Sequence, residues 1–415
     1  MEMIQFENIG QLVTLAPLAT EKRTTSITYA DLGIVKNAWM RVHEGCVHSY
    51  GEMQHCPYAE ETLDLKGALV LPGFVDAHTH PIFAGDRSSE FVQRLSGLTY
   101  EDIAKQGGGI SSSMRATRAT SREDLEALTL MRLQQFLRYG TTTVEVKSGY
   151  GLSAPSEKLH LEVLQALKPK TPQEVVITCM ALHACPPEFS SMDSYVTAMK
   201  ETLLPLIAQE KLASYVDVFL ELGYFTPSEA MDQFMAQAKA LGLGIRVHAD
   251  EFTESAGALS AARWHAASAD HLQHSSREGI AAMAQAGVTA ILLPGTSLYT
   301  AIPFTDARPF VEAGCAVAIA SDYNPGSCRI YNLALLATLA GIHCHLSLPQ
   351  ILAAITYVPS VSLGLGTKKG ALAPNFDADF VVYNSISTVE EWLATCGMQV
   401  PDSVFIKGSS ALKTV

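Results

Sequence analysis

The chain has 415 residues, and 48% of them are hydrophobic. This combination is typical of a globular protein with a sizeable core, built as one large α/β domain or as two to three ordinary domains. Because 42 acidic residues outnumber 29 basic ones and the formal net charge is -13, neither nucleic acid nor an anionic membrane is expected as the main partner. A small metabolite is favoured instead.

The eight cysteines are scattered along the chain, mostly in apolar contexts. A chain of this length does not need disulfide bonds for stability, so a reducing compartment is expected. The N-terminal stretch MEMIQFENIG lacks the basic and apolar regions of a signal peptide, and the longest apolar run, LALLATLAGI, is too short to span a bilayer. We therefore expect a cytoplasmic protein without membrane association.

Residues 1–66 contain short strand-like segments separated by polar turns, with no helical period. They predict the first part of a small β domain. The Cys- and His-rich stretch at 41–58 lies in this region but lacks the paired Cys spacing of a structural zinc site. A β hairpin with surface histidines is the preferred interpretation.

Between residues 67 and 364, strand-like runs alternate with helical patterns, which predicts parallel strands joined by helices. The eight runs are ALVLPGFVDAHTH, GTTTVEVKSG, VVITCMALHA, ASYVDVFLELG, LGIRVHADE, ASADHLQH, VTAILLPG and CAVAIASD. Eight parallel strands are the number that closes a barrel. Residues 365–415 return to strand-like pieces, so the predicted fold class is α/β: a (β/α)8 TIM-like barrel with a small composite β-sandwich formed by both termini.

Two helical patterns affect this interpretation. In SREDLEALTLMRLQQFLRYG, Ser121 with Asp124 three residues later resembles a capping box, and Gly140 ends the helix. The pattern around His343 and His345 is also helical, and residues i and i+2 of a helix point apart. A metal site at this His-x-His pair is therefore disfavoured.

The residues that act in such a barrel project from the C-terminal ends of its strands. The runs end in His78 and His80, in His183, in His248 followed by Asp250 and Glu251, in His271 and His274, and in Asp322. Two residues apart on a strand, His78 and His80 share a face, with Cα atoms about 6.5 to 7 Å apart, so they can converge on one ion. Together with His248 and Asp322 they make a coherent zinc or iron site.

Other polar residues near the strand ends have structural explanations. Asp76 can accept backbone hydrogen bonds, and Glu145 can form an ion pair with Lys147. Glu221 is more simply explained as a satisfied barrel carboxylate, and His274 as a surface or supporting residue. The glycine run at 106–109 fits no Rossmann or P-loop pattern and predicts a mobile loop beside the site.

Longer stretches carry a family resemblance. LPGFVDAHTH, VHADE and ASD resemble the amidohydrolase superfamily, whose barrel bears a metal. From about 70 to 365, the stretches RSSEFVQRLSGLTYEDIAKQGGGISSSMRATRAT, TTTVEVKSGYGL, ALHACPPEF, SADHLQH and SDYNPGS are similar to the imidazolonepropionase family. The resemblance implies one Zn²⁺ or iron ion (Fe²⁺ or Fe³⁺) per chain, a homodimer, and hydrolysis of 4-imidazolone-5-propanoate to N-formimidoyl-L-glutamate, the third step of L-histidine degradation.

Matching residue by residue gives the implied site. The metal ligands are His78, His80, His248 and Asp322. The residues implied to contact the substrate are Arg87, Tyr150, His183 and Glu251, and those beside the ring-opened product are Asn324, Gly326 and Ser327. Tyr100 is a further candidate to contact the ring or the carboxylate, with core or loop packing as the alternative. The catalytic roles are Asp322 as base, His271 as hydrogen-bond donor to the oxyanion, and Glu251 as holder of the ring N–H groups. The fourth strand, ASYVDVFLELG, lacks the carboxylated lysine of dinuclear members, which favours one ion.

The sequence also departs from the family pattern. Proline is usual where Ala77 stands, threonine is common where Ser327 stands, and GALAPNFDADF lacks a glycine-lysine pair usual in the superfamily. Two alternatives stay open: another amidohydrolase, such as a cyclic amidine deaminase or a different cyclic amide hydrolase, and a noncatalytic scaffold. Arg87 disfavours a neutral nucleobase as substrate, and the presence of all four ligands disfavours a scaffold. His3Asp suits both zinc and iron.

Overall fold

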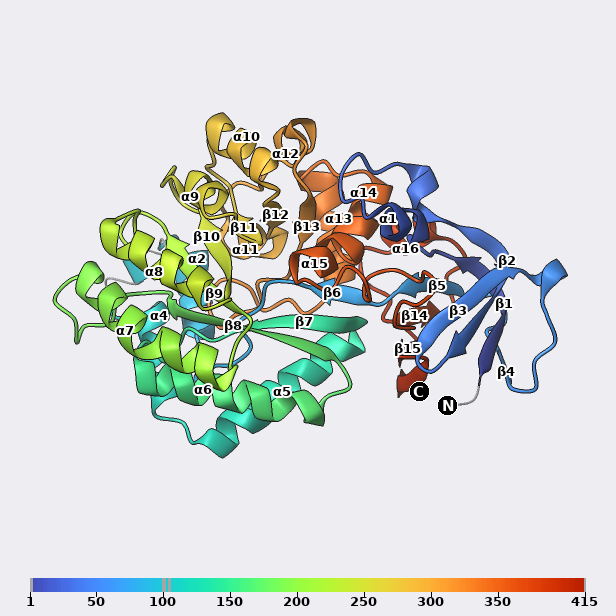
Figure 1. Cartoon of the computed structure of the whole chain (residues 1–415), viewed down its shortest axis with the longest axis horizontal. Helices are drawn as coiled ribbons and strands as arrows, with labels where there is room; N and C mark the ends of the chain where they lie inside the picture. Colours follow the sequence, from blue (N-terminus) through green and yellow to red (C-terminus); the bar gives the residue numbers. More distant parts are fainter. Residues whose placement is uncertain (1–2, 99–101, 104–105, 414–415) are drawn as a thin grey trace.

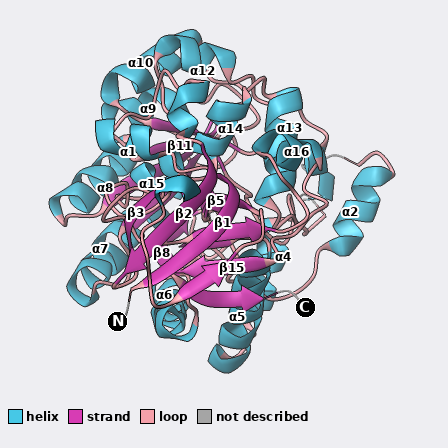
Figure 2. Cartoon of the chain, turned by 90° about the vertical axis from the view of Figure 1, so that its right-hand side faces the viewer, coloured by secondary structure: helices cyan, strands magenta, loops and turns pink. Residues whose placement is uncertain are grey.

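Two β-sheets organise the chain. The computed structural model describes residues 3–98, 102–103 and 106–413, and both ends of the chain lie at the same end of the molecule (Figure 1). A barrel of parallel strands occupies the other end, surrounded by helices (Figures 1 and 2). The predicted α/β class is confirmed.

The barrel sheet follows chain order from its first strand to its last, and each neighbouring pair is parallel. Its strands are β6 (Phe74–Asp76), β7 (Thr141–Lys147), β8 (Glu174–Leu182), β9 (Tyr215–Leu220), β10 (Gly244–Ala249), β11 (Ser268–His271), β12 (Thr289–Leu292) and β13 (Val317–Ile319). Just beyond the outer strands, a parallel bridge joins Thr79 to Tyr323. The His80 amide donates to the Tyr323 carbonyl at 2.8 Å and the Asp322 amide to the His78 carbonyl at 2.9 Å. Closure of the barrel therefore brings its first and last functional segments side by side.

The run at 68–80, predicted as one barrel strand, is two strands in different sheets. β5 (Leu69–Pro72) pairs with the terminal strands, and β6 begins the barrel after Gly73. A Cβ on Gly73 would lie 2.3 Å from Oγ1 of Thr142, so only glycine allows this close approach between the chain and β7. A continuous apolar run cannot reveal such a change of sheet, because both strands are buried.

Helices form an outer ring around the barrel strands (Figure 2). They are α2 (Ser88–Leu95), α4 (Ile110–Arg118), α5 (Arg122–Arg138), α6 (Ala154–Leu167), α7 (Met192–Glu210), α8 (Glu229–Ala240), α9 (Gly257–Arg263), α10 (Arg277–Ala286), α11 (Pro294–Thr300), α12 (Arg308–Ala313), α13 (Leu333–His343), α14 (Leu348–Ala354) and α15 (Tyr357–Ser362). The predicted cap of α5 is confirmed, since the Ser121 side chain accepts from the Asp124 amide and Gly140 follows with φ +91°. The prediction that the helix continues past His343 to His345 is wrong. Helix α13 ends at His343, and His345 has φ +62°.

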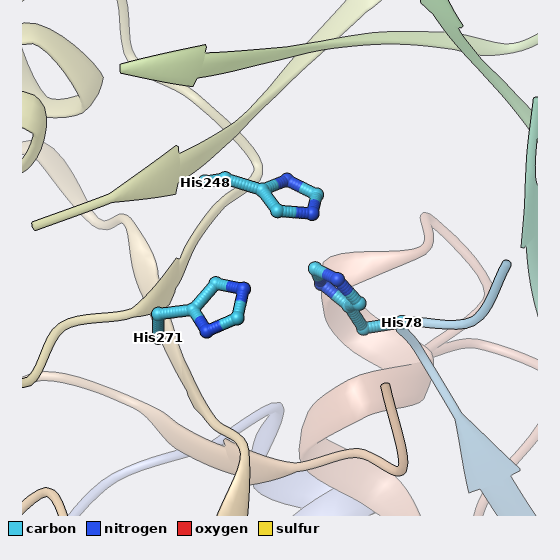
Figure 3. Close-up of side chains that lie close together, drawn as sticks. All are labelled: His78, His248 and His271. Carbon is cyan, nitrogen blue, oxygen red and sulfur yellow. The ribbon is translucent and has the colours of Figure 1, made fainter. Parts of the chain in front are cut away.

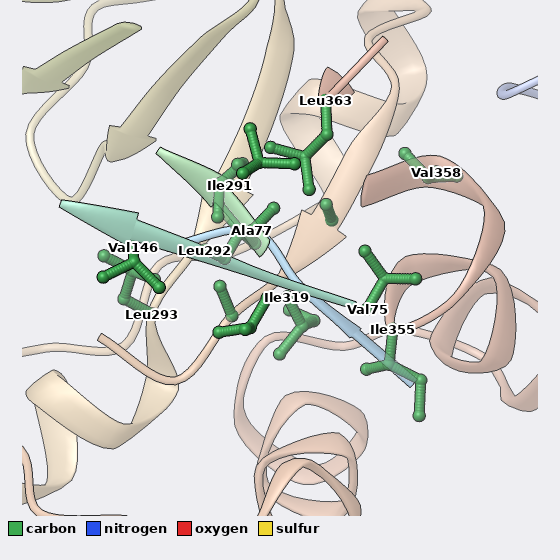
Figure 4. Close-up of a cluster of buried hydrophobic side chains, with 14 of the residues drawn as sticks. Val75, Ala77, Val146, Ile291, Leu292, Leu293, Ile319, Ile355, Val358 and Leu363 are labelled. Atoms are coloured by element: carbon green, nitrogen blue, oxygen red, sulfur yellow. The ribbon is translucent and has the colours of Figure 1, made fainter. Parts of the chain in front are cut away.

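An apolar cluster holds the two strands that lead into the candidate site. Val75 and Ala77 from the β6 segment and Ile319 from β13 pack with Ile355 and Val358 near α15 (Figure 4). Each of these side chains is buried, and burial of a large aliphatic side chain contributes about 1.5–3 kcal/mol. The backbone that carries the site is therefore fixed by packing on the side away from the cavity.

The second sheet is mixed and contains strands from both ends of the chain, as predicted. Its strands are β1 (Ile4–Leu12), β2 (Val35–His43), β3 (Cys46–Glu52), β4 (Thr62–Asp64), β5, β14 (Phe380–Tyr383), β15 (Ser403–Ile406) and β16 (Ser409–Lys413), in the order β16-β15-β14-β5-β1-β2-β3 with β4 beside β1. Phe6 packs edge-on against Phe380 and Phe405 in its core. Helices α1 (Ala16–Glu21) and α16 (Val389–Ala394) and the short 3-10 helices η1 (Tyr29–Leu32), η2 (Met53–His55) and η3 (Lys168–Lys170) complete the structure. The prediction of no helix before residue 67 is wrong for α1, which is only six residues long.

The remaining structural expectations also have clear outcomes. β2 and β3 form the predicted hairpin, and His43, His48 and His55 are exposed. All eight cysteines are free thiols. Among the described residues, no helix combines the length and the apolar character needed to cross a membrane.

Candidate active site

Four of the predicted metal ligands meet beyond the C-terminal ends of barrel strands. Nε2 of His80 lies 3.2 Å from Nε2 of His78 and 3.4 Å from Nε2 of His248. Oδ1 of Asp322 lies 3.5 Å from Nε2 of both His78 and His80. All four side chains are at most 3% exposed. Three imidazole nitrogens and one carboxylate oxygen at these separations fit the donor set of a transition-metal ion.

Carboxylates orient two of these imidazoles from behind. Nδ1 of His78 lies 2.6 Å from Oδ2 of Asp270, and Nδ1 of His248 lies 3.0 Å from Oδ1 of Asp217. With the proton on Nδ1, each carboxylate accepts it and the lone pair of Nε2 faces the centre. Nδ1 of His80 has no hydrogen-bond partner among the described residues. This pattern is what a site for a metal requires, because Nε2 must be unprotonated to bind it.

His271 lies in the same cluster. Its ring centroid is 5.2 Å from that of His248 and 5.6 Å from that of His78, and the three rings face a common space in Figure 3. Ligand atoms of these three histidines come within 4.8 Å of one another. The backbone of His271 has φ +78°, a conformation that is rare outside glycine and turns the chain at the end of β11. By distance alone, His271 is thus close enough to act on anything held by the other histidines.

Burial governs the charges of the site. It lowers the pKa well below 6.5 for the three imidazoles of His78, His80 and His271. It raises the pKa of Asp322 to about 6, against hydrogen bonding from Thr296. It raises the pKa of Glu251 well above its ordinary value, and the carboxylates of Asp322 and Glu221 add to that rise. The imidazoles are therefore neutral near pH 7, whereas Glu251 tends to keep a proton.

A cavity opens in front of these groups and encloses about 470 Å³, including the part open to solvent. It is lined by His80, Arg87, Ile110, Tyr150, His183, Phe219, Tyr224, His248, Glu251, Phe252, His271, Asp322, Asn324 and Ser327. Most of the predicted contact residues are in this set. His78 lies beside the cavity against His80, Gly326 lies against Arg87, and Tyr100 is outside the described residues.

Arg87 is buried at the edge of this cavity and is paired with an acid. Its Nε and Nη2 lie 2.9 and 2.8 Å from Oε2 of Glu90, whose Oε1 accepts the Gly109 amide at 3.1 Å. A Cβ on Gly326 would lie 2.2 Å from Cζ of Arg87, so glycine permits the guanidinium to rest against the backbone. Arg87 and Glu90 are both buried, so this ion pair is not a surface contact.

Comparison with known proteins identifies the family of this chain. The amidohydrolase family model matches residues 69–411. Imidazolonepropionase from Symbiobacterium thermophilum is 42% identical over 92% of this chain and 90% of its own length, and that from Bdellovibrio bacteriovorus is 39% identical over 91% and 90%. The chain belongs to the imidazolonepropionases of the amidohydrolase family.

Solved structures agree on the fold of this imidazolonepropionase family member. The zinc complex of atrazine chlorohydrolase TrzN from Arthrobacter aurescens TC1 with atraton aligns with a TM-score of 0.76 at 16% identity, covering 99% of this chain and 95% of the other. Guanine deaminase from E. coli aligns with a TM-score of 0.72 at 15% identity, covering all of both chains. At such low identity the similarity concerns the barrel and its terminal sheet alone.

The loops around the cavity are held by buried acceptors. Glu157 accepts the amides of Gly149, Gly151 and Leu152, and so fixes the loop that carries Tyr150. Nδ1 of His183 lies 3.0 Å from the carbonyl of Gly149. Tyr150, in the loop after β7, and His183, directly after β8, are therefore linked through the Gly149 carbonyl.

The turn after β13 is organised in the same way. Oδ1 of Asn324 accepts the amides of Gly326 and Ser327 at 2.8 and 2.7 Å, while its Nδ2 donates to the Asp322 carbonyl at 2.7 Å. Nδ2 also donates to Oγ of Ser327 at 2.7 Å. These bonds tie the turn to the residue that carries the candidate ligand carboxylate.

The structural explanations offered for nearby polar residues are confirmed. Asp76 accepts the Ser321 amide at 3.0 Å, and Nζ of Lys147 lies 2.8 Å from Oε1 of Glu145. Glu221 accepts the Phe252 amide at 2.8 Å and the Leu222 amide at 2.9 Å. His274 is exposed.

Sequence reasoning missed the apolar wall of the cavity, formed by Ile110, Phe219, Tyr224 and Phe252. Each of these follows or ends a segment that was singled out: the glycine run, the fourth strand and VHADE. Their position beside these segments was the sequence signal that could have identified them. Aromatic and aliphatic side chains at such positions are more often core residues than wall residues, so their type carries little information.

Proposed function

We propose that the site described above carries out the activity of this family, hydrolysis of the cyclic amide of 4-imidazolone-5-propanoate to N-formimidoyl-L-glutamate in L-histidine degradation. The observation that carries the proposal is that a chain about 40% identical to imidazolonepropionases over nine-tenths of its length places the matching histidines and aspartate at the mouth of one cavity. A cavity lined by aromatic side chains and a few convergent polar groups is typical of a small-molecule site.

His78, His80, His248 and Asp322 would hold one ion of zinc or iron, because their donor atoms converge while the far nitrogens of two imidazoles meet carboxylates. Such an ion supplies a hydroxide from bound water at neutral pH and polarises a carbonyl. His78 and His80, whose pKa burial lowers, require no proton loss near pH 7 before they bind it. Low pH is expected to weaken binding by protonating Asp322, whose pKa burial raises to about 6.

Asp322 is the residue assigned to move the proton. Its Oδ2 accepts the hydroxyl of Thr296, which leaves Oδ1 facing the histidines. A carboxylate beside the bound water is placed to take up its proton. His271, whose Nδ1 lies 3.6 Å from Oε1 of Glu251, would donate to the oxyanion. Glu251, which tends to keep its proton, would hold the ring nitrogens of the substrate.

Arg87 is assigned to the propionate of the substrate. Glu90 engages one edge of the guanidinium through Nε and Nη2, and such a bridge holds the planar group in one orientation. Tyr150 and His183, which also line the cavity, would contact the ring, and Tyr100 is assigned to the same substrate from the sequence. Asn324, Gly326 and Ser327 would border the opened product.

The direct test is an assay of the purified protein with freshly made imidazolone propionate, followed by the loss of its ultraviolet absorbance. Turnover that a chelator abolishes and Zn²⁺ or Fe²⁺ restores is the expected result. Guanine serves as the control substrate, since a deaminase of this fold would act on it and a propionate hydrolase would not. Absence of chelator-sensitive turnover of imidazolone propionate would refute the proposal.

A further inference from the structure

A buried lysine lies directly behind the candidate ligands. Lys147 ends β7 with its side chain fully buried. Its Nζ lies 2.7 Å from Oδ2 of Asp217, 2.8 Å from Oε1 of Glu145 and 3.9 Å from Oδ2 of Asp270. Asp217 and Asp270 are the carboxylates that orient two of the candidate ligand histidines. One ammonium group is therefore shared by the supports of both imidazoles.

The same carboxylates have the geometry of a second cation site. Ligand atoms of Asp217, Asp270 and His248 lie within 4.8 Å of one another. Apart from the contact of Asp217 with Lys147, Oδ2 of Asp217 and Oδ1 of Asp270 have no hydrogen-bond partner in the described part of the chain. Hard divalent cations prefer carboxylate oxygens. The Lys147 ammonium lies against these carboxylate oxygens, where such a cation would bind.

The charges of the cluster show why this ammonium matters. Glu145, Asp217 and Asp270 are all fully or almost fully buried, and the cations nearest to them are Lys147 and Arg246. Nε of Arg246 is 3.8 Å from Oε1 of Glu145, and Arg246 also interacts electrostatically with Asp270 and Asp217. Without Lys147, these three buried carboxylates would share the single cation Arg246. Such groups either take up a proton or bind another cation.

We propose that Lys147 is a resident cation that occupies the second cation position of this centre and thereby keeps the centre to one metal ion. It is a positioning residue, because it touches the supporting carboxylates and not the substrate. The inference rests on the proposed function only through the first ion, which His78, His80, His248 and Asp322 would hold. It gives a second reason to expect a single ion. This reason is a lysine on the second barrel strand, and it is independent of the absence of a lysine from the fourth strand.

The test uses the full chain loaded with zinc and then exposed to Mn²⁺, which favours a carboxylate site. Metal content is measured by mass spectrometry, and bound manganese by electron paramagnetic resonance. Wild type should hold about one zinc ion and no tightly bound manganese, whereas Lys147→Ala should hold in addition about one manganese ion per chain. The matched control is Lys147→Ala with Asp217→Asn, which removes the cation and one carboxylate together and should bind no manganese. A purely structural role for Lys147 would lower metal content and would not raise it.

The outcomes separate the two claims. Wild type that binds no zinc overturns the proposed metal centre and the inference with it. Zinc-bound wild type together with folded Lys147→Ala that takes up no manganese overturns the inference alone, because the carboxylates must then be neutralised by protons. If Lys147→Ala is insoluble when produced alone, refolding with millimolar Mn²⁺ should recover it. Failure of Mn²⁺ to recover it would also refute the inference.

Discussion

Two buried lysines, one in the barrel and one beside the terminal sheet, make almost identical ion pairs. Nζ of Lys147 lies 2.8 and 2.7 Å from Glu145 and Asp217, and Nζ of Lys369 lies 2.8 and 2.7 Å from Asp377 and Asp379. The local chemistry is the same in both regions. What differs is the next contact of each carboxylate.

In the barrel, the next contact is an imidazole of the candidate metal centre, as between Asp217 and His248. Beside the terminal sheet it is backbone: Oδ1 of Asp379 accepts the Lys407 amide at 2.8 Å, and the Asp379 carbonyl accepts the Gly73 amide. The first ion pair therefore borders the candidate metal centre, and the second joins the C-terminal strands to the start of the barrel. The comparison shows that the geometry of a buried ion pair does not by itself reveal the role of that pair.

The largest expected effect is a loss of turnover when the candidate metal site of the barrel is changed. Asp322→Ala removes a candidate ligand and the assigned base, so turnover of imidazolone propionate should fall by about 10³-fold or more. The measurement is kcat together with metal content. Asp306→Ala, at an exposed aspartate paired with Arg308, should leave kcat unchanged. Near wild-type turnover of Asp322→Ala with metal bound would show that another group is the base.

A substitution in the ion pair beside the terminal sheet should lower stability and leave catalysis unchanged. Lys369→Met leaves Asp377 and Asp379 without their shared cation, and breaking a buried pair from one side costs about 3–5 kcal/mol. The free energy of unfolding, measured in urea, should fall by about 3 kcal/mol, while kcat of the folded fraction and metal content stay at wild-type values. A lower kcat of the folded variant would mean that the two regions are coupled.

The next effect concerns substrate binding and not the chemical step. Arg87→Met removes the assigned partner of the propionate, and hydrogen bonds to charged groups contribute about 1.5–3 kcal/mol. KM for imidazolone propionate should therefore rise about 10- to 100-fold, with a smaller change for an imidazolone that lacks the carboxylate. Arg122→Met, at an exposed arginine paired with Glu162, is the control. Equal effects on both substrates would rule out the carboxylate contact.

The smallest effect should come from the outer ring of helices. Ser121→Ala removes the side-chain acceptor for the Asp124 amide at the start of α5, and the loss of such a cap costs about 1 kcal/mol. Thermal unfolding should shift by about 1 °C with KM and kcat unchanged. Ser121→Asp restores an acceptor and should recover most of the loss. No shift for Ser121→Ala would mean that tertiary packing alone holds this end of the helix.

Local patterns were sufficient for much of the architecture. Alternation of strand-like and helical segments predicted the parallel barrel, and polar residues after the runs identified His78, His80, His248 and Asp322 as strand-end residues. These features depend on periodicity and on the rule that parallel strands end at one face, and both can be read from a single sequence.

Other features depend on contacts between segments far apart in the chain. The change of sheet at Gly73 arises because Thr142 lies against it. The burial of the Arg87–Glu90 pair arises because Gly326, 239 positions after Arg87, leaves room for the guanidinium. Neither depends on neighbouring residues in the sequence, so periodicity could not predict them.

By itself, the sequence determined the strand count, the candidate ligand types and the family resemblance, because composition, spacing and motif are local properties. Only the tertiary structure decided that Asp217 and Asp270 stand behind His248 and His78, and that Lys147 lies between these carboxylates. Those side chains come from four different barrel strands and the segment after a fifth. They meet because the barrel closes. The Lys147 ammonium can offset the charges of the two carboxylates only after these strands lie side by side.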